Sequence, residues 1–119
     1  MVKIFCFLNR KAGMTTAEFR DYYENNHVPL IKRLIPFYDT YKRNFASEVQ
    51  DYETGHLENK AGTQAPFDVI TELTFKTQAD YQKMIDALSD PEIGGVIARD
   101  EENVFDRDAM RIYMIDEYV

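Results

Sequence analysis

The chain has 119 residues, 45% of them hydrophobic and 29% charged, and its formal net charge is −7. This length and balance predict one globular domain over residues 1–119 and exclude a disordered chain. The negative charge argues against a nucleic-acid partner, because binding to phosphates needs a basic surface. No apolar run approaches the roughly 20 residues that span a bilayer, so no membrane partner is expected.

The first apolar segment, "VKIFCFL" at residues 2–8, contains the only cysteine, Cys6. No disulfide can form within the chain, which suits a reducing environment and predicts a cytoplasmic protein. The segment is followed by Asn9 without a small-residue cleavage site, so we interpret it as a first strand and not as a signal peptide. Its apolar side chains alternate onto both faces of the strand.

A helix is predicted after Thr15. Thr15 and Glu18 form a T-x-x-E capping box, which satisfies free backbone amides in the first helical turn. The buried face of this helix is marked by three aromatic residues at helical spacing: Phe19, Tyr22 and Tyr23. Pro29 is expected to end the regular helix or to begin a new short turn, because the residue before a proline is pushed out of helical geometry.

Two further strands flank a long polar segment. Aromatic spacing predicts a strand over residues 38–45, and alternation of apolar and polar side chains predicts another over residues 67–75. The polar, acidic stretch at 46–66 is predicted to be a loop of the length that proteins use as a lid or a binding loop.

Two more helices and a strand are predicted for the rest of the chain. A second capping motif begins at Thr77 and precedes apolar residues at i, i+3, i+4 and i+7. The pair Asp90 and Pro91 is typical of a helix start, and this helix is expected to run toward Phe105. The stretch "MRIYMIDEYV" at 110–119 is predicted to be the last strand.

The order β-α-β-β-α-β, with an extra helix before the last strand, predicts an α+β ferredoxin-like fold. In such a fold the helices cover one face of a four-stranded sheet. The first and last predicted strands carry apolar residues on both faces, so the other face of the sheet is expected to be apolar as well. An open apolar face predicts a partner, and the simplest partner is a second copy in a homodimer.

The third predicted strand carries candidate functional residues. Asp68, Ile70 and Glu72 share one face of it. If Leu73 and Phe75 face the helices, the two carboxylates point into a cavity of the dimer, with Ile70 as a ligand contact between them. An enclosed carboxylate has a raised pKa and can act as an acid or a base. A solvated strand face is the alternative interpretation.

His27 is one of two histidines in the chain. Imidazole titrates near neutrality, so a histidine in a cleft is a favoured general acid or base. A histidine near a helix C-terminus can instead simply complement the helix dipole. The other histidine, His56, lies in the long polar loop and is predicted to be solvated. No spacing typical of metal ligands occurs, so no metal is expected.

The stretch "KAGMTTAEFRDYYENNHVPL" resembles the signature of the EthD-domain family, in which a G-M-T-x-x-E-F-x-x-Y-x-E-x-x-H-x-P run follows the first strand. The matching residues are Gly13, Met14, Thr15, Glu18, Phe19, Tyr22 or Tyr23, Glu24, His27 and Pro29. The later "YKRNF" and "VFDRDAMRIYMIDEYV" also resemble the family. The resemblance implies a dimeric α+β barrel in which the motif histidine, here His27, points into the cleft between helix and sheet.

The resemblance also implies a function. Several members of this family are cofactor-free dehydratases, decarboxylases or cyclases of aromatic-polyketide pathways. His27 is therefore expected to move a proton next to a carbonyl of an aromatic or polyketide-like substrate, without a cofactor. Asp68 or Glu72 is expected to orient the imidazole or to protonate a leaving hydroxyl. The residues expected to contact the substrate are Tyr22, Tyr41, Ile70 and Tyr113, and Tyr22 or Tyr41 could donate a hydrogen bond to a developing enolate.

Two other functions fit the same residues. A non-catalytic binding protein would hold a hydrophobic small molecule in the cavity, with His27 as a hydrogen-bond partner. Haem proteins also occur on this fold, and His27 would then be an axial ligand.

Overall fold

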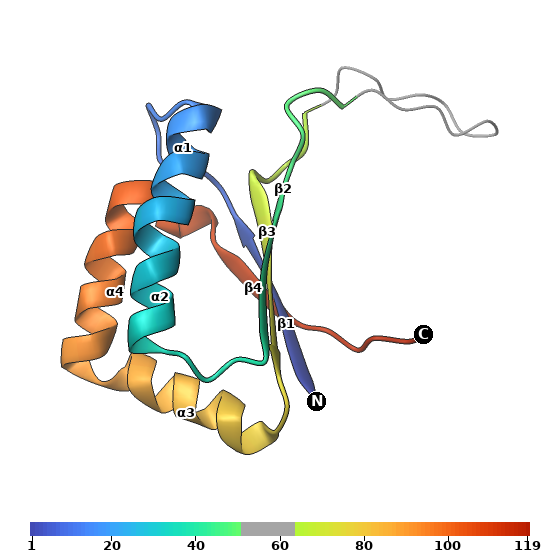
Figure 1. Cartoon of the computed structure of the whole chain (residues 1–119). Coiled ribbons are helices and arrows are strands. Elements are labelled where there is room, and N and C mark those ends of the chain that lie inside the picture. The colour runs from blue at the N-terminus through green and yellow to red at the C-terminus, as the bar shows by residue number, and fades with distance from the viewer. Residues whose placement is uncertain (51–63) are drawn as a thin grey trace.

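The computed structural model describes residues 1–50 and 64–119, and within them a four-stranded sheet carries its helices on one face (Figure 1). The strands are β1 (Val2–Leu8), β2 (Thr40–Phe45), β3 (Val69–Phe75) and β4 (Arg111–Met114). They lie in the order β2-β3-β1-β4, and all neighbours are antiparallel. The predicted α+β ferredoxin-like fold is therefore confirmed.

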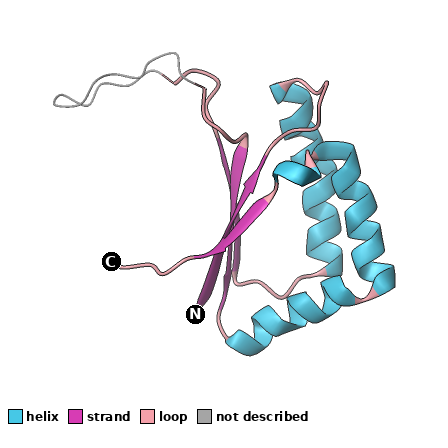
Figure 2. Ribbon diagram, turned by 180° about the vertical axis from the view of Figure 1, so that it is seen from behind, coloured by secondary structure: helices cyan, strands magenta, loops and turns pink. Residues whose placement is uncertain are grey.

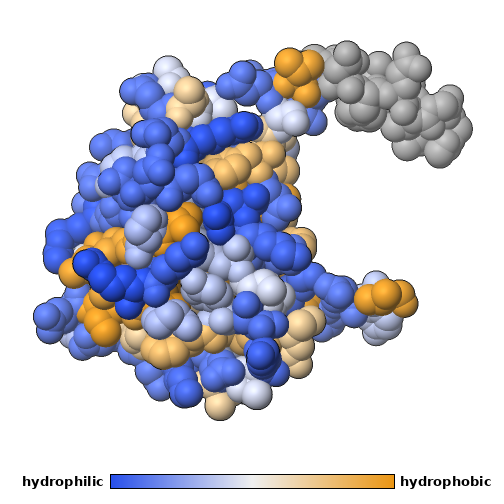
Figure 3. All heavy atoms as spheres, viewed as in Figure 1, coloured by the Kyte–Doolittle hydropathy of each residue, from blue (hydrophilic) through white to orange (hydrophobic). Residues whose placement is uncertain are grey.

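The helical segments pack together as one layer, which Figure 2 shows from behind. They are α1 (Thr16–Tyr22), the π-helical turn η1 (Tyr23–His27), α2 (Val28–Leu34), α3 (Gln78–Ser89), α4 (Pro91–Val104) and the short 3-10 turn η2 (Arg107–Ala109). None of the helices in the described part of the chain is both long and apolar enough to cross a membrane. Hydrophilic side chains cover most of the surface seen in Figure 3.

The predicted helix starts are confirmed. Thr15 and Glu18 exchange both hydrogen bonds of a capping box at the start of α1. The side chains of Thr77 and Asp90 accept backbone N–H groups three residues further on, and they cap α3 and α4. These caps satisfy amides that a helix leaves without an internal partner.

Of the two expectations at Pro29, the second holds: a new helical segment, α2, begins at Val28 with Pro29 in its first turn, and the chain does not leave helical geometry there. Segments α1, η1 and α2 follow one another without interruption, and the N–H of Val28 donates to the carbonyl of Tyr23, five residues earlier. A proline inside a regular helix lacks an N–H and its ring collides with the carbonyl four residues before it. The wider π turn ahead of Pro29 lets the chain continue as a helix. His27 therefore lies inside a continuous run of helical segments and not at its C-terminus.

Strand β1 spans the predicted residues, and the other three strands are shorter than predicted. β2 and β3 each begin two residues after the predicted start, and β4 contains four residues instead of the ten predicted. β4 is an edge strand that pairs only with the segment from Ile4 to Phe7 of β1. Most of the predicted loop at 46–66, including His56, lies outside the described residues.

Alternation along the strands divides the sheet into two faces. The helix-facing side chains of the two central strands are buried: Val2, Ile4, Cys6, Leu8, Val69, Thr71, Leu73 and Phe75. The opposite side, which we call the open face, carries Phe5, Phe7, Ile70, Glu72 and Tyr113. The ring of Phe7 meets those of Phe67 and Tyr113 edge to face, with centroids 5.7 and 5.8 Å apart. The same face also carries Lys3, Lys42 and Arg111, so the expectation of an apolar open face is confirmed only in part.

Candidate active site

A cavity of about 120 Å³ lies between the helices and the helix-facing side of the sheet. Its walls are mainly aliphatic side chains from β1, β3, α2, α3 and α4. The lining residues that carry a polar or titratable group are Cys6, Tyr23, His27, Tyr41, Thr71 and Glu101. An apolar cavity of roughly 150 Å³ can bind benzene, so this cavity has room for about one small ring.

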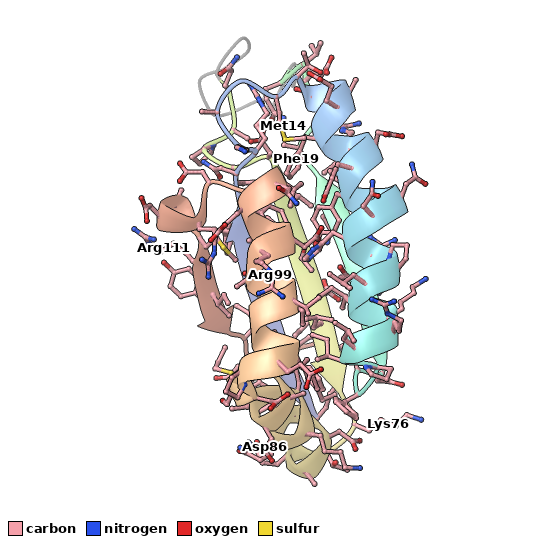
Figure 4. All side chains as sticks on the ribbon, turned by 90° about the vertical axis from the view of Figure 1, so that its left-hand side faces the viewer. Met14, Phe19, Lys76, Asp86, Arg99 and Arg111 are labelled. Atoms are coloured by element: carbon pink, nitrogen blue, oxygen red, sulfur yellow. The ribbon has the colours of Figure 1, made fainter. Side chains whose placement is uncertain are left out.

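Side chains fill the space between α4 and the helices that run from α1 to α2, as the view onto the helical layer shows (Figure 4). Arg99, labelled there, lies on the exposed side of α4. The opposite side of the same helix carries Asp100 and Glu101 toward the interior, where both are partly buried.

His27 and Asp100 form the polar centre of the site. His27 is only 5% exposed, and its Nδ1 lies 2.7 Å from Oδ2 of Asp100. The hydroxyl of Tyr22 donates to the other carboxylate oxygen of Asp100 at 2.6 Å. Asn103 donates to the oxygen of that same hydroxyl at 3.2 Å. Both oxygens of the carboxylate are thus occupied, and the carboxylate is held in a fixed orientation.

The imidazole of His27 is neutral at pH 7. Burial lowers the pKa of His27, and the hydrogen bond and charge of Asp100 oppose this shift only in part. The rings of Tyr23 and Phe105 enclose the imidazole edge to face, each with a centroid distance of 5.2 Å. Because a carboxylate only accepts hydrogen bonds, Nδ1 carries the proton and Nε2 carries a lone pair.

The lone pair on Nε2 is accessible from the cavity. Nε2 has no hydrogen-bond partner within residues 1–50 and 64–119. In that same part of the chain, every fully buried polar side-chain atom has a partner. Since His27 lines the cavity, solvent or a ligand reaches Nε2 there. A neutral imidazole with a fixed tautomer and a free nitrogen can accept a proton from a bound molecule.

Three hydroxyl groups line the same cavity. The hydroxyl of Tyr23 lies 2.5 Å from Oγ1 of Thr71, and the hydroxyl of Tyr41 donates to that of Tyr23 at 3.4 Å. Burial raises the pKa of Tyr23 to about 12 and also raises the pKa of Tyr41. Both phenols therefore stay protonated at neutral pH, and they can donate hydrogen bonds to an oxygen atom of a ligand.

The structure separates the predicted substrate contacts. Tyr41 lines the cavity beside His27. Tyr22 contacts Asp100 and is not among the residues that line the cavity. Ile70 and Tyr113 lie on the open face, on the other side of the sheet.

Asp68 is not brought to His27. It lies just before β3 and forms an ion pair with Arg10, whose Nη1 is 2.6 Å from Oδ1 of Asp68. The backbone N–H of Arg10 donates to Oδ2 of the same carboxylate at 2.7 Å. These contacts tie the end of β1 to the start of β3, away from the cavity.

Glu72 is not brought to His27 either. Its neighbour Thr71 faces the cavity, and side chains alternate along a strand, so Glu72 points to the open face. There its carboxylate lies 3.7 Å from Nζ of Lys3 and 3.9 Å from Nζ of Lys42. The predicted orientation of Glu72 away from the helices is confirmed. The carboxylate that contacts the imidazole is that of Asp100.

Sequence reasoning missed the two acidic residues of α4. Asp100 and Glu101 follow the buried Ile97 by three and four residues, and the buried Val104 follows at the same spacing. Charged residues at the positions of a buried helical stripe are rarely placed there without a partner. That spacing was the available signal for a polar site on this helix. Among the described residues, no three potential ligand side chains gather as a metal site would require.

Together these features define a ferredoxin-like α+β domain with a histidine–carboxylate pair at a partly open, largely apolar cavity. The chain belongs to the EthD family, since the model of that family, described as "EthD domain", matches residues 11–108. The resemblance that begins in the segment 11–30 is thereby confirmed.

Solved structures share the fold. The chain is similar to an ethyl tert-butyl ether D (EthD) family protein from Bacillus halodurans, with 17% identity, a TM-score of 0.61, and coverage of 99% of this chain and 100% of the other. An EthD-like protein from Ralstonia eutropha is 14% identical, with a TM-score of 0.62, and the match covers 96% of this chain and 86% of the other. HapK from Hahella chejuensis is 11% identical, with a TM-score of 0.58, and the match covers 99% of this chain and 93% of the other. No curated protein matches the chain.

Proposed function

We propose that this protein is an acid–base enzyme that acts without a cofactor on an aromatic or polyketide-like small molecule, as a dehydratase, decarboxylase or cyclase. The observation that carries the proposal is the environment of His27. Its Nδ1 is fixed by Asp100, and its Nε2 faces an apolar cavity with room for about one ring. Membership of the EthD family supports the same class of reaction.

In the proposed mechanism, Nε2 of His27 accepts a proton from the carbon next to a carbonyl group of the substrate. Asp100 keeps the imidazole in the correct tautomer and stabilises the imidazolium that forms. The hydroxyl of Tyr41 exchanges its long hydrogen bond to Tyr23 for one to the enolate oxygen, as negative charge develops on that oxygen. The apolar walls limit the access of water, which strengthens each of these interactions. Asp100 thus takes the orienting role that was expected of Asp68 or Glu72.

We also propose that a second copy of the chain covers the open face. The aromatic rings of Phe7, Phe67 and Tyr113 cluster there, and Tyr113 is 53% exposed in the single chain. A contiguous apolar surface of this kind is typical of an interface. Ile70 and Tyr113 would then contact the partner copy, and Glu72 would lie at its edge with Lys3 and Lys42.

Proton abstraction can be tested before the natural substrate is known. Phenylacetone, a single-ring ketone, would be incubated with the protein in D₂O, and exchange at the carbon beside the carbonyl would be followed by NMR. We expect the wild type to accelerate exchange above the buffer rate. We expect His27→Gln to lower the enzymatic rate by about 10²-fold or more, because it removes the proton acceptor.

The control variant is His56→Gln, which changes the other histidine of the chain and should leave the exchange rate unchanged. Phenylacetone binding is measured alongside, by thermal shift. If the wild type binds phenylacetone without accelerating exchange, the protein is a binding protein and the catalytic proposal is wrong. Equal exchange rates in the wild type and His27→Gln would also contradict it.

A further inference from the structure

Glu101 is a second titratable residue of the cavity, and the mechanism above leaves it without a role. It lines the same cavity as His27, and its side chain is 19% exposed. It follows Asp100 directly on α4, but Asp100 is occupied by His27 and Tyr22. The two neighbouring carboxylates therefore have different surroundings.

The carboxylate of Glu101 accepts no hydrogen bond from the described part of the chain. Among the residues that the structure describes, the nearest cation is Arg107, whose Nε lies 3.6 Å from Oε1 of Glu101. This distance exceeds that of a hydrogen bond. Arg107 is also 3.8 Å from Glu102, so it is shared between two carboxylates. The oxygens of Glu101 remain free to accept a hydrogen bond from a molecule in the cavity.

Glu101 lies where the cavity opens. A surface depression beside η2 shares Leu88, Ile97, Glu101, Met110 and Ile112 with the cavity, and it also includes Arg107. Glu101 is thus one of five residues that the cavity and the depression have in common, and it is the only one of the five that carries a charge.

The charge of Glu101 is not balanced by a lysine or an arginine in the cavity wall, because neither occurs among the lining residues. The negative charge of Glu101 also acts on Cys6, another residue of the cavity wall. Burial, the larger cause, and the charge of Glu101, the smaller one, raise the pKa of the Cys6 thiol to about 12. Burial also raises the pKa of Glu101 itself, and Arg107 opposes that shift. An anionic ligand would meet an unfavourable potential in this cavity.

We infer that Glu101 accepts a hydrogen bond from a hydroxyl group of an uncharged ligand and excludes carboxylate ligands from the cavity. This inference rests on the proposed function, since it concerns the substrate of the same site. It narrows the aromatic or polyketide-like substrates to neutral, hydroxyl-bearing molecules.

A matched pair of ligands tests the inference. 4-Methylphenol and 4-methylbenzoate have the same ring and methyl group, but at pH 8 the first is neutral and the second is an anion. Their dissociation constants would be measured by calorimetry at pH 8 and low salt. We expect the wild type to bind 4-methylphenol at least about tenfold more tightly than 4-methylbenzoate. In Glu101→Gln we expect this preference to fall to about threefold or less.

Two further variants complete the design. Glu102→Gln is the matched control, because Glu102 also pairs with Arg107 but its side chain is 64% exposed; the preference should persist. Arg107→Gln removes the only cation near Glu101 in the described residues, and the preference for the neutral ligand should increase.

If both ligands bind the wild type and Glu101→Gln with the same preference, the inference is wrong while the cavity remains a ligand site. If neither ligand binds the wild type, the cavity as a ligand site is wrong, and the inference with it.

Discussion

Asp100 fixes His27 through one carboxylate oxygen while the other oxygen is held by Tyr22. The two distances are 2.7 Å from Oδ2 to Nδ1 of His27 and 2.6 Å from Oδ1 to the hydroxyl of Tyr22. Rotation of the carboxylate would break both hydrogen bonds, so the imidazole keeps one tautomer and one orientation. A histidine that is held in this way by a carboxylate is prepared for proton transfer at its other nitrogen.

Asp100→Asn should change both the pKa and the tautomer of His27. The substitution removes the charge that holds the pKa of His27 up, so that pKa should fall further below its ordinary value of about 6.5. The new amide group can donate to Nδ1, which would place the proton on Nε2 and lower the exchange rate by about 10²-fold or more. NMR titration of the ring protons measures the pKa directly, because the chain has only two histidines. Glu102→Gln, on the same helix, is the control and should leave the titration unchanged.

The stability of the protein should fall as the pH decreases below about 6.5. Burial lowers the pKa of His27 in the folded state, so the unfolded chain binds more protons between the two pKa values. The free energy of unfolding therefore rises with pH through this window and then levels off. The raised pKa of Glu101 acts in the opposite sense at lower pH, so the informative quantity is the difference between the wild type and His27→Gln. Urea unfolding at pH 5, 6, 7 and 8 measures it. Parallel curves for the two proteins would contradict the prediction.

The hydrogen bond between Tyr23 and Thr71 should contribute to stability as a pair. The two oxygens are buried and 2.5 Å apart. Tyr23→Phe leaves the hydroxyl of Thr71 without this partner and should cost about 1–3 kcal/mol. Adding Thr71→Val removes that unpaired hydroxyl. The loss of unfolding free energy in the double variant should therefore be about 1 kcal/mol smaller than the sum of the two single losses. A double-mutant cycle by urea unfolding measures this coupling, and purely additive effects would contradict it.

Features that depend on neighbouring residues could be predicted from the sequence. The caps at Thr15, Thr77 and Asp90 each join a side chain to a backbone amide three residues further on, so the local pattern is sufficient. The orientation of Glu72 follows from alternation along a strand in the same way. These local rules also give the order of elements, and with it the fold.

Features that depend on packing between distant segments could not be predicted. His27 and Asp100 are 73 positions apart, and they meet only because α4 packs beside η1. Asp68 and Glu72 were chosen as partners because they lie on a strand with clear alternation, yet that alternation turns Glu72 to the opposite face from His27. The rule for Pro29 left two outcomes open, an end of the helix or a new turn, and it could not foresee the π turn that joins α1 to α2.

Two adjacent glycines in α4 should respond differently to alanine. A Cβ atom at Gly94 would lie 2.2 Å from the backbone oxygen of Leu88, so α3 and α4 could not keep their close approach. Gly94→Ala should therefore destabilise the fold by about 2 kcal/mol or more. A Cβ atom at Gly95 would meet only the end of the flexible Arg99 side chain, at 3.4 Å.

Gly95→Ala is thus the matched control for Gly94→Ala, and alanine should stabilise the helix there by about 0.5–1 kcal/mol. Thermal and urea unfolding of the two variants compare them directly. Equal effects would mean that the approach of α3 to α4 does not require Gly94.

Tyr113→Lys should convert the proposed homodimer into a monomer. Tyr113 lies on the open face with its ring centroid 5.8 Å from that of Phe7, and a second copy that covers this face would bury an unpaired ammonium group in the variant. Light scattering coupled to size exclusion should give twice 14.0 kDa for the wild type and 14.0 kDa for Tyr113→Lys. Tyr118→Lys is the control, because Tyr118 is 95% exposed and follows the end of β4. A monomeric wild type would contradict the proposed interface.

The cavity of His27 lies on the other side of the sheet, so the monomeric variant should still bind 4-methylphenol. If the variant loses this binding together with the dimer, the cavity depends on the second copy.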